Sequence, residues 1–271
     1  INTTGFLTPG DGGGAPWKKT STAGQTASQS PAQLGFPLLN NGNGNQWALV
    51  VNGELHVASL GGTNNYTDDD TLPIRAAVSI KNAVRLSLKN RLTGQINCAE
   101  GVTLLGSNFK GGILQGSSSI FDNSNTTIYV QFGSGFEDLG VGITSVADRT
   151  AYFDNAAIVL NTGCSIDGVG FYYPDQNMLN NDTVTTPPTK YAPAIIISYL
   201  AEATSITNIN IGNCYVGIDV RKQHNGCFIK DIYGSPLSIG IRTGSTMGFD
   251  DIQDTNFVLG NAYKDPQFPV Q

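Results

Sequence analysis

Five aspartates in the last quarter of the chain have the residue type and the spacing that hydrolysis of a glycosidic bond needs. They are Asp219, Asp231, Asp250, Asp251 and Asp254. A glycoside hydrolase uses two carboxyl groups, about 5 Å apart when configuration is retained and about 6.5–9.5 Å apart when it is inverted. Asp231 and Asp251 each precede an isoleucine in segments of similar sequence. If those segments are stacked strands about 4.8 Å apart, the two carboxylates are neighbours in space.

Two other interpretations of these residues stay open. Aspartate is an ordinary turn residue because its side chain bonds to nearby backbone groups, and for any single aspartate this role is the more frequent one. A lyase would instead need a base near a sugar C5 proton and a cation that neutralises a uronate. Lys222 and His224 could supply these groups, although a solvated loop is the simpler interpretation.

Sugar binding by aromatic stacking is better supported than either kind of cleavage. Six tyrosines lie in the middle and later parts of the chain: Tyr172, Tyr173, Tyr191, Tyr199, Tyr215 and Tyr233. A tyrosine ring offers the CH face of a saccharide a flat apolar surface, and its hydroxyl adds a hydrogen bond. Tyr172 and Tyr173 precede a long polar insertion between Pro174 and Pro193. We therefore predict that this pair binds substrate.

An internal repeat indicates the elements that position these residues. Ile206-Thr-Asn-Ile209 recurs as Ile229-Lys-Asp-Ile232, and Val216-Gly-Ile-Asp219 recurs as Ile239-Gly-Ile-Arg242, with the same interval in both cases. Units of about 20–25 residues that are rich in β-branched residues are typical of one turn of a β-solenoid. Val169 and Leu139 extend the pattern backwards at longer intervals, and Ile252 extends it forwards at a slightly shorter one.

Composition and charge exclude several functional classes. Only 13% of the 271 residues are charged and the net charge is -6, which argues against a nucleic-acid partner. No stretch approaches the roughly 20 apolar residues of a membrane span. The four cysteines form no CxxC pair, so we predict buried thiols, with neither a metal site nor a cofactor. The chain starts at Ile1 without an initiator Met or a signal pattern, so we expect a part of a longer protein.

The sequence predicts two domains. Residues 1–66 form a turn-rich β-module, with a hairpin between residues 47 and 57 around Asn52-Gly53. Residues 67–271 form a helix followed by the coil. Asp68-Asp-Asp-Thr71 offers capping oxygens, and Ile74, Ala77 and Val78 share one helical face that can cover the open first turn. A metal site at the three aspartates is the alternative.

Three segments resemble the opening of bacteriophage tailspike proteins. They are Gly10-Asp-Gly-Gly-Gly-Ala15, Asn43-Gly-Asn-Gln-Trp-Ala-Leu49 and Asp68-Asp-Asp-Thr-x-x-Ile74. The run from Val169 to Gln176 is similar to a tailspike turn, and the resemblance covers residues 5–262. It implies an all-β fold, with a small N-terminal module on the virion side, one short capping α-helix and a right-handed, single-stranded parallel β-helix of the pectate-lyase-like type.

The resemblance also implies a function. A tailspike is a homotrimer on the phage tail that is assembled in the host cytoplasm and contacts other tail or adaptor proteins. It recognises host capsule or O-antigen polysaccharide and often depolymerises it, and for this chain an endo-glycosidase is favoured over a lyase. One alternative is a non-enzymatic adaptor segment of the tail, and another is a secreted bacterial pectate-lyase-like enzyme. Tailspikes usually run on for more turns, so we expect the coil to continue beyond Gln271.

Overall fold

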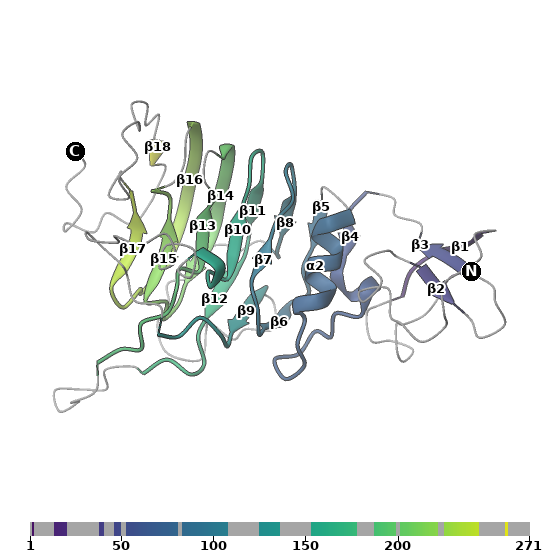
Figure 1. The fold of residues 1–271 in the computed structure, drawn as a ribbon, viewed down its shortest axis with the longest axis horizontal. Coiled ribbons are helices and arrows are strands. Elements are labelled where there is room, and N and C mark those ends of the chain that lie inside the picture. The colour runs from purple at the N-terminus through teal and green to yellow at the C-terminus, as the bar shows by residue number, and fades with distance from the viewer. Residues whose placement is uncertain are drawn as a thin grey trace.

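The chain forms a coil of parallel β-strands with an α-helix near its start, in the part of the chain that the structure describes. The computed structural model describes residues 2, 14–20, 38–40, 46–49, 53–80, 83–107, 125–135, 153–177, 187–198, 201–221, 225–243 and 258–259. Turns of the coil stack along the long axis, and helix α2 (Thr71–Ile80) lies between the coil and a small N-terminal sheet (Figure 1). Within these ranges no helix has the length and apolar character to cross a bilayer.

Two parallel sheets make up the walls of the coil. The shorter sheet contains β7 (Ile96–Asn97), β10 (Ile158–Leu160), β13 (Ile195–Ile197), β15 (Val216–Asp219) and β17 (Ile239–Arg242). The longer sheet contains β4 (Leu55–His56), β5 (Ala83–Arg85), β6 (Lys89–Leu92), β8 (Thr103–Leu105), β9 (Thr127–Val130), β11 (Ser165–Asp167), β12 (Gly170–Tyr172), β14 (Glu202–Ile211), β16 (Asn225–Gly234) and β18 (Val258–Leu259). This arrangement confirms the predicted parallel β-helix.

The strand register confirms the repeat where the turns are short. Ile209 pairs with Ile232 and Val216 pairs with Ile239, as the two repeated motifs predicted. The longer interval from Val169 to Ile209 is also confirmed, because Gly170 pairs with Asn210. The predicted alignment of Val169 with Leu139 is wrong, because Gly170 pairs in the preceding turn with Thr127, well before Leu139.

A bend divides the longer sheet into two legs. The register aligns Gly168 with Asn208 and Asn208 with Asp231, and all three have a positive φ, of 71°, 52° and 54°. Glycine, asparagine and aspartate are the residues that adopt this conformation at the lowest cost. The first leg consists of β4, β5, β8, β11, β18 and the residues of β14 and β16 before the bend. The second leg consists of β6, β9, β12 and the residues of β14 and β16 after it.

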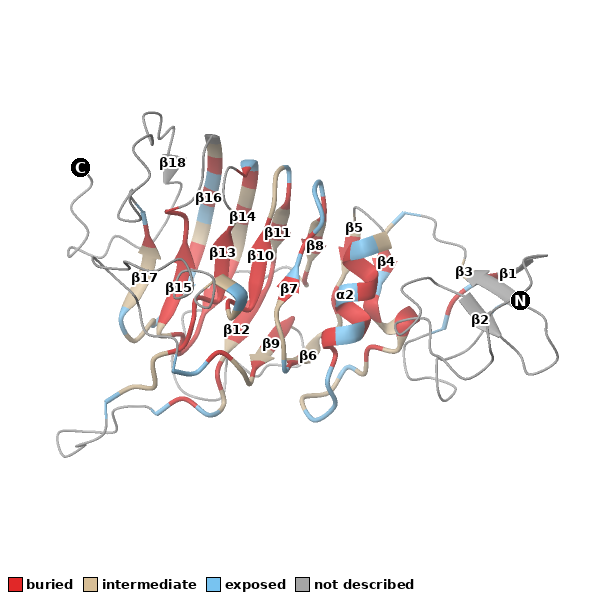
Figure 2. Ribbon diagram, viewed as in Figure 1, coloured by how far each residue is buried: buried red, intermediate tan, exposed pale blue. Residues whose placement is uncertain are grey.

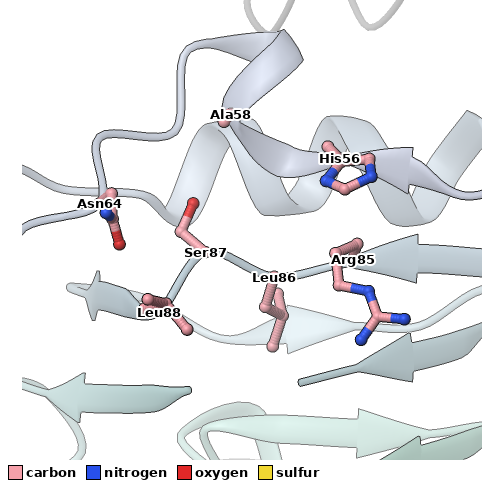
Figure 3. Close-up of a pocket in the computed structure, with 7 residues that line it drawn as sticks. All are labelled: His56, Ala58, Asn64, Arg85, Leu86, Ser87 and Leu88. Atoms are coloured by element: carbon pink, nitrogen blue, oxygen red, sulfur yellow. The ribbon is translucent and has the colours of Figure 1, made fainter. Parts of the chain in front are cut away.

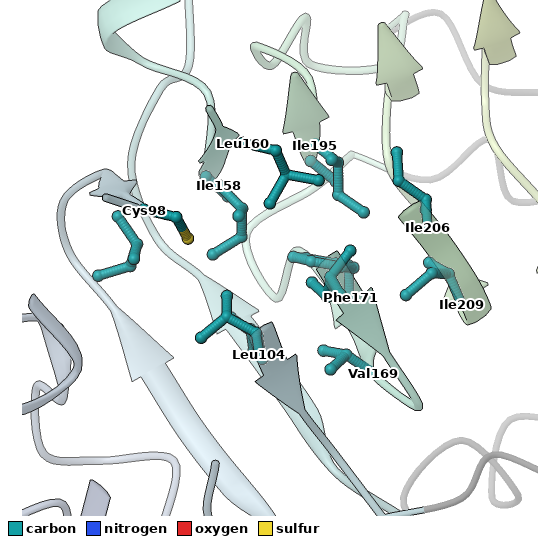
Figure 4. Close-up of a cluster of buried hydrophobic side chains, with 14 of the residues drawn as sticks. Cys98, Leu104, Ile158, Leu160, Val169, Phe171, Ile195, Ile206 and Ile209 are labelled. Atoms are coloured by element: carbon teal, nitrogen blue, oxygen red, sulfur yellow. The ribbon is translucent and has the colours of Figure 1, made fainter. Parts of the chain in front are cut away.

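The interior of the coil is one continuous apolar core. Buried residues run along β10, β12, β13 and β15 (Figure 2), and side chains from both sheets, including Leu104 and Ile158, fill the space between the walls (Figure 4). All four cysteines are buried thiols, as predicted. Burial raises the pKa of the Cys227 thiol to about 11, so this side chain behaves as a small apolar residue at neutral pH.

The predicted capping helix is confirmed. The buried face of α2 includes Ile74, Ala77 and Val78, which pack into the same core as the coil. At its start, the carboxylate of Asp69 accepts a hydrogen bond of 3.0 Å from the backbone N–H of Thr71. This bond satisfies one of the donors that a helix N-terminus leaves open.

The predicted hairpin between residues 47 and 57 is wrong. Strand β3 (Gln46–Leu49) pairs antiparallel with β1 (Trp17–Thr20) and β2 (Leu38–Asn40), whereas β4 pairs in parallel with β5. Leu55 pairs with Val84 and is buried with it in the coil core. This burial favours the pairing of β4 with β5 over a local hairpin with β3. The sheet of the coil therefore begins at Leu55, ahead of the predicted boundary at residue 66.

Asp70 joins the start of the helix to the coil. Its buried carboxylate accepts hydrogen bonds from the backbone N–H groups of Thr63 (2.8 Å) and Arg91 (3.2 Å). Burial raises the pKa of Asp70 to about 6, against the lowering effect of these bonds. The folded protein therefore holds this proton more tightly than the unfolded chain, and the contribution of Asp70 to stability falls as the pH rises from about 4 to about 7.

We expect the free energy of unfolding to decrease by about 2 kcal/mol over this pH range because of Asp70. Urea unfolding at a series of pH values measures the slope. Asp70→Asn cannot ionise and should remove the slope, whereas Asp68→Asn, at an exposed position of the same loop, should keep it. An unchanged slope in Asp70→Asn would assign the titration to another group.

Candidate functional site

Three tyrosines form a stacked row on the outer surface of the second leg. Tyr129 of β9 pairs in register with Tyr172 of β12, and their ring centroids are 5.3 Å apart with planes tilted by 47°. Tyr66, from the loop before α2, stacks on Tyr129 with ring centroids 3.7 Å apart and planes 11° from parallel. We call Tyr66, Tyr129 and Tyr172 the tyrosine stripe. All three are partly exposed.

Only one member of the predicted tyrosine pair belongs to this surface. Phe171 and Tyr173 are each 1% exposed, while Tyr172 between them points outward. Tyr173 packs against Tyr191 with ring centroids 4.7 Å apart, and its hydroxyl donates a hydrogen bond to the carbonyl of Ala192 at 3.4 Å. The prediction that Tyr173 binds sugar is therefore wrong, because successive side chains of a strand point to opposite faces.

The sequence analysis missed the other two members of the tyrosine stripe. Tyr129 has a local signal, since it alternates with the buried residues Ile128 and Val130 and must therefore point outward. Tyr66 has none, because it lies in a loop and reaches Tyr129 only through the tertiary structure. Burial raises the pKa of both hydroxyls, which keeps them neutral and able to donate hydrogen bonds at physiological pH.

Polar side chains surround the tyrosine stripe. The Nζ atom of Lys89 lies 5.7 Å from the ring centroid of Tyr66. Arg91 pairs in register with Tyr129 and donates hydrogen bonds to the side-chain oxygen of Gln131 and the carbonyl of Thr67. Beyond them, the amide of Gln131 donates to Asp175 at 3.2 Å. An aromatic surface edged by hydrogen-bonding groups is chemically suited to a saccharide.

Asp219 has a different environment from the one predicted. It is 1% exposed, and its carboxylate lies 2.6 Å from the guanidinium of Arg221 and 3.7 Å from that of Arg242. Arg242 belongs to β17, one turn further along the coil, so the ion cluster joins two turns. A catalytic carboxylate must reach its substrate, and a buried position between two arginines does not fit that role.

Asp231 occupies the bend between the two legs. Its carboxylate is partly exposed and lies 3.8 Å from the Nζ atom of Lys230. Asn208, its neighbour in the previous turn, donates a hydrogen bond of 2.7 Å to Asp167. The left-handed backbone of Asp231 agrees with the turn interpretation given above. A catalytic role for Asp231 stays a prediction.

The remaining predicted site residues lie outside the described residues. They are Lys222, His224, Asp250, Asp251 and Asp254. The stacking of Asp231 on Asp251 stays a prediction, because Asp251 and Ile252 are not among the residues that the structure describes. In the ranges that the structure describes, no group of three or more His, Cys, Asp and Glu side chains is placed to hold a metal ion.

A small hollow lies beside the first turn of the coil (Figure 3). Its volume is 190 Å³, and it is lined by His56, Ala58, Asn64, Arg85, Leu86, Ser87 and Leu88. The guanidinium of Arg85 is already bound to Glu54 at 2.8 Å and to the carbonyl of Gly106 at 2.6 Å. Ligand pockets usually measure about 300–1,000 Å³, so we assign the candidate site to the tyrosine stripe instead.

The fold is a parallel β-helix that carries a row of three partly exposed tyrosines on its outer surface. No protein-family model and no curated protein matches the chain. Among solved structures, the chain is similar to tailspike protein 2 from Escherichia coli O157:H7 bacteriophage CAB120, with 11% identity, a TM-score of 0.40, and coverage of 88% of this chain and 33% of that one. It is also similar to tailspike protein gp49 from Acinetobacter baumannii bacteriophage Fri1, a capsular polysaccharide depolymerase, with 12% identity, a TM-score of 0.43, and coverage of 92% and 47%.

The chain therefore spans between a third and a half of the length of these two tailspikes. At identities and TM-scores this low, the similarities carry no information on substrate or activity.

Proposed function

We propose that this chain is part of a phage tailspike and that its tyrosine stripe binds a polysaccharide of the host surface, either capsule or O-antigen. The single observation that supports this proposal most is the stack of three partly exposed tyrosines, two on neighbouring strands of the second leg and one on the loop before α2. Partly exposed aromatic rings keep apolar area in contact with water, and a sugar ring that covers them removes that area from water.

The shape of the site favours a chain-like ligand over a small metabolite. Small-molecule sites are concave and enclose most of the ligand. The tyrosine stripe instead lies on an outer surface and crosses from the loop before α2 to strands β9 and β12. An extended polysaccharide can contact several of these rings at once. In the complete spike, the N-terminal module would join the virion and other tail proteins, and the coil would assemble as a trimer, which light scattering can test.

Cleavage is a separate part of the proposal. An endo-glycosidase would need a carboxylate pair, and Asp231, Asp250, Asp251 and Asp254 stay the predicted candidates. The test is to incubate the protein with capsular and O-antigen polysaccharides and to measure both binding and release of oligosaccharides. Binding with release supports a depolymerase, and binding without release supports a receptor-binding segment. Absence of binding to every polysaccharide contradicts the proposal and favours the adaptor alternative.

Tyr172→Ala should weaken polysaccharide binding about fivefold, because one aromatic stacking contact contributes about 1 kcal/mol. Isothermal titration with a bound polysaccharide measures the change. Phe228→Ala is the matched control, since Phe228 is an aromatic residue, 42% exposed, on the first leg of the coil. Equal losses in both variants would indicate a general loss of structure, and no loss in Tyr172→Ala would remove the tyrosine stripe from the binding site.

A further inference from the structure

The end of the tyrosine stripe nearest α2 carries two cationic side chains. Lys89 pairs in register with Thr127, and its ammonium group approaches the ring of Tyr66 at 5.7 Å from the centroid. Arg91 lies two residues further along β6, beside Tyr129. Both residues are partly exposed. A ligand on the rings of Tyr66 and Tyr129 would therefore lie next to two positive charges.

The hydrogen bonds of the Arg91 side chain go to uncharged acceptors. Its guanidinium donates to the side-chain oxygen of Gln131 and to the carbonyl of Thr67. Among the described residues, neither Lys89 nor Arg91 is within 4.0 Å of a carboxylate oxygen in an ion pair. Neither positive charge is therefore neutralised by direct contact with a carboxylate in this part of the chain.

The nearby carboxylates are engaged with other groups. Asp69 accepts hydrogen bonds from Thr71 and Thr93, and Asp70 accepts them from Thr63 and from the backbone of Arg91. Two more carboxylates accept bonds from side-chain amides, Asp68 from Asn65 and Asp175 from Gln131.

We propose that this end of the tyrosine stripe binds a negatively charged sugar, so that the polysaccharide recognised by the chain is anionic. The inference rests on the proposed function and names the substrate class of the same site. A hydrogen bond between a cation and an anion is about twice as strong as a neutral one. The chain as a whole carries a net charge of -6, which repels anions in general. The two cations beside the partly exposed tyrosines favour an anionic group at that place in particular.

The charge of the sugar can be tested with three small probes on the intact protein. Methyl glucuronide carries a carboxylate, glucose 6-phosphate carries a phosphate, and methyl glucoside carries neither. Titration by NMR, followed at the backbone amides of Lys89 and Tyr129, gives a Kd for each probe. We expect at least one of the anionic probes to bind about fivefold or more tightly than the glucoside, with the preference weakened by added salt.

Two variants of Lys89 separate charge from structure. Lys89→Gln should lower the affinity for the preferred anionic probe to near that of the glucoside, whereas Lys89→Arg should retain the preference. Equal affinity for the three probes in the wild-type protein would overturn this inference and leave the tyrosine stripe as a neutral sugar site. Absence of shifts at the tyrosine stripe with all three probes at saturating concentrations would overturn the proposed function as well.

Discussion

Asp219→Asn is expected to lower the free energy of unfolding by about 3 kcal/mol. The carboxylate of Asp219 is 1% exposed and faces the guanidinium groups of Arg221 at 2.6 Å and Arg242 at 3.7 Å. Asparagine keeps the shape of the side chain and removes its charge. Two buried guanidinium groups then lose the anion that they share, and removal of one member of a buried ion cluster is strongly destabilising.

Asp231→Asn is the matched control for this prediction. It also removes one carboxylate charge, but from a partly exposed position whose side chain lies 3.8 Å from Lys230. Asparagine tolerates the positive φ of 54° at this bend, so the free energy of unfolding should change by less than about 1 kcal/mol. Urea unfolding followed by circular dichroism compares both variants with the wild type. If Asp219→Asn retained full stability and lost polysaccharide cleavage instead, Asp219 would be catalytic and the structural role argued above would be wrong.

Gly106→Ala is expected to destabilise the protein by about 3 kcal/mol because two turns of the coil approach too closely at this position. A Cβ atom on Gly106 would lie 2.0 Å from the carbonyl oxygen of Gly168. Both backbones are held in place, since the N–H of Gly106 donates to the carbonyl of Asp167 at 2.8 Å and the N–H of Gly168 donates to Thr207 at 3.1 Å. The clash therefore has to be relieved by separating the turns.

Gly240→Ala tests whether this effect comes from the close approach. A Cβ atom on Gly240 meets only the ring of Pro236, at 3.4 Å, and no positive φ is needed there. We expect its midpoint of thermal unfolding to stay close to that of the wild type, while the midpoint of Gly106→Ala falls by several degrees. Similar midpoints for the two variants would show that the turns can move apart at low cost.

The repeat in the sequence predicted the stacking of turns where consecutive turns have equal length. Ile206 pairs with Ile229, as the repeated motif indicated, because the segment between them completes one circuit of the coil without an insertion. The same reasoning failed between Thr127 and Gly170, because inserted residues lengthen the interval without changing the register. Backbone hydrogen bonds between neighbouring turns set that register. The number of residues between two paired positions therefore does not reveal which positions pair when a loop is inserted.

The structure separates the two tyrosines of the predicted pair for a similar reason. Tyr172 lies in the tyrosine stripe, and its role in sugar binding stays a prediction. Its neighbour Tyr173 is buried, since alternation along a strand allows only one of two adjacent residues to face outward and the core contacts of Phe171 and Tyr173 decide which. Tyr66 could not be predicted, because its contact with Tyr129 joins the loop before α2 to a strand much later in the chain.

By itself, the sequence determined that the chain is a parallel β-helix with a helix at its start, and that tyrosine and aspartate are the side chains available for sugar chemistry. These properties follow from local patterns, namely the spacing of Ile and Val and the capping residues before Thr71. Only the tertiary structure decided which tyrosines share a surface and that Asp219 is enclosed by arginines from two turns. The reason is physical: stacking brings together residues that are far apart in the chain, and the length of each inserted loop decides which residues meet.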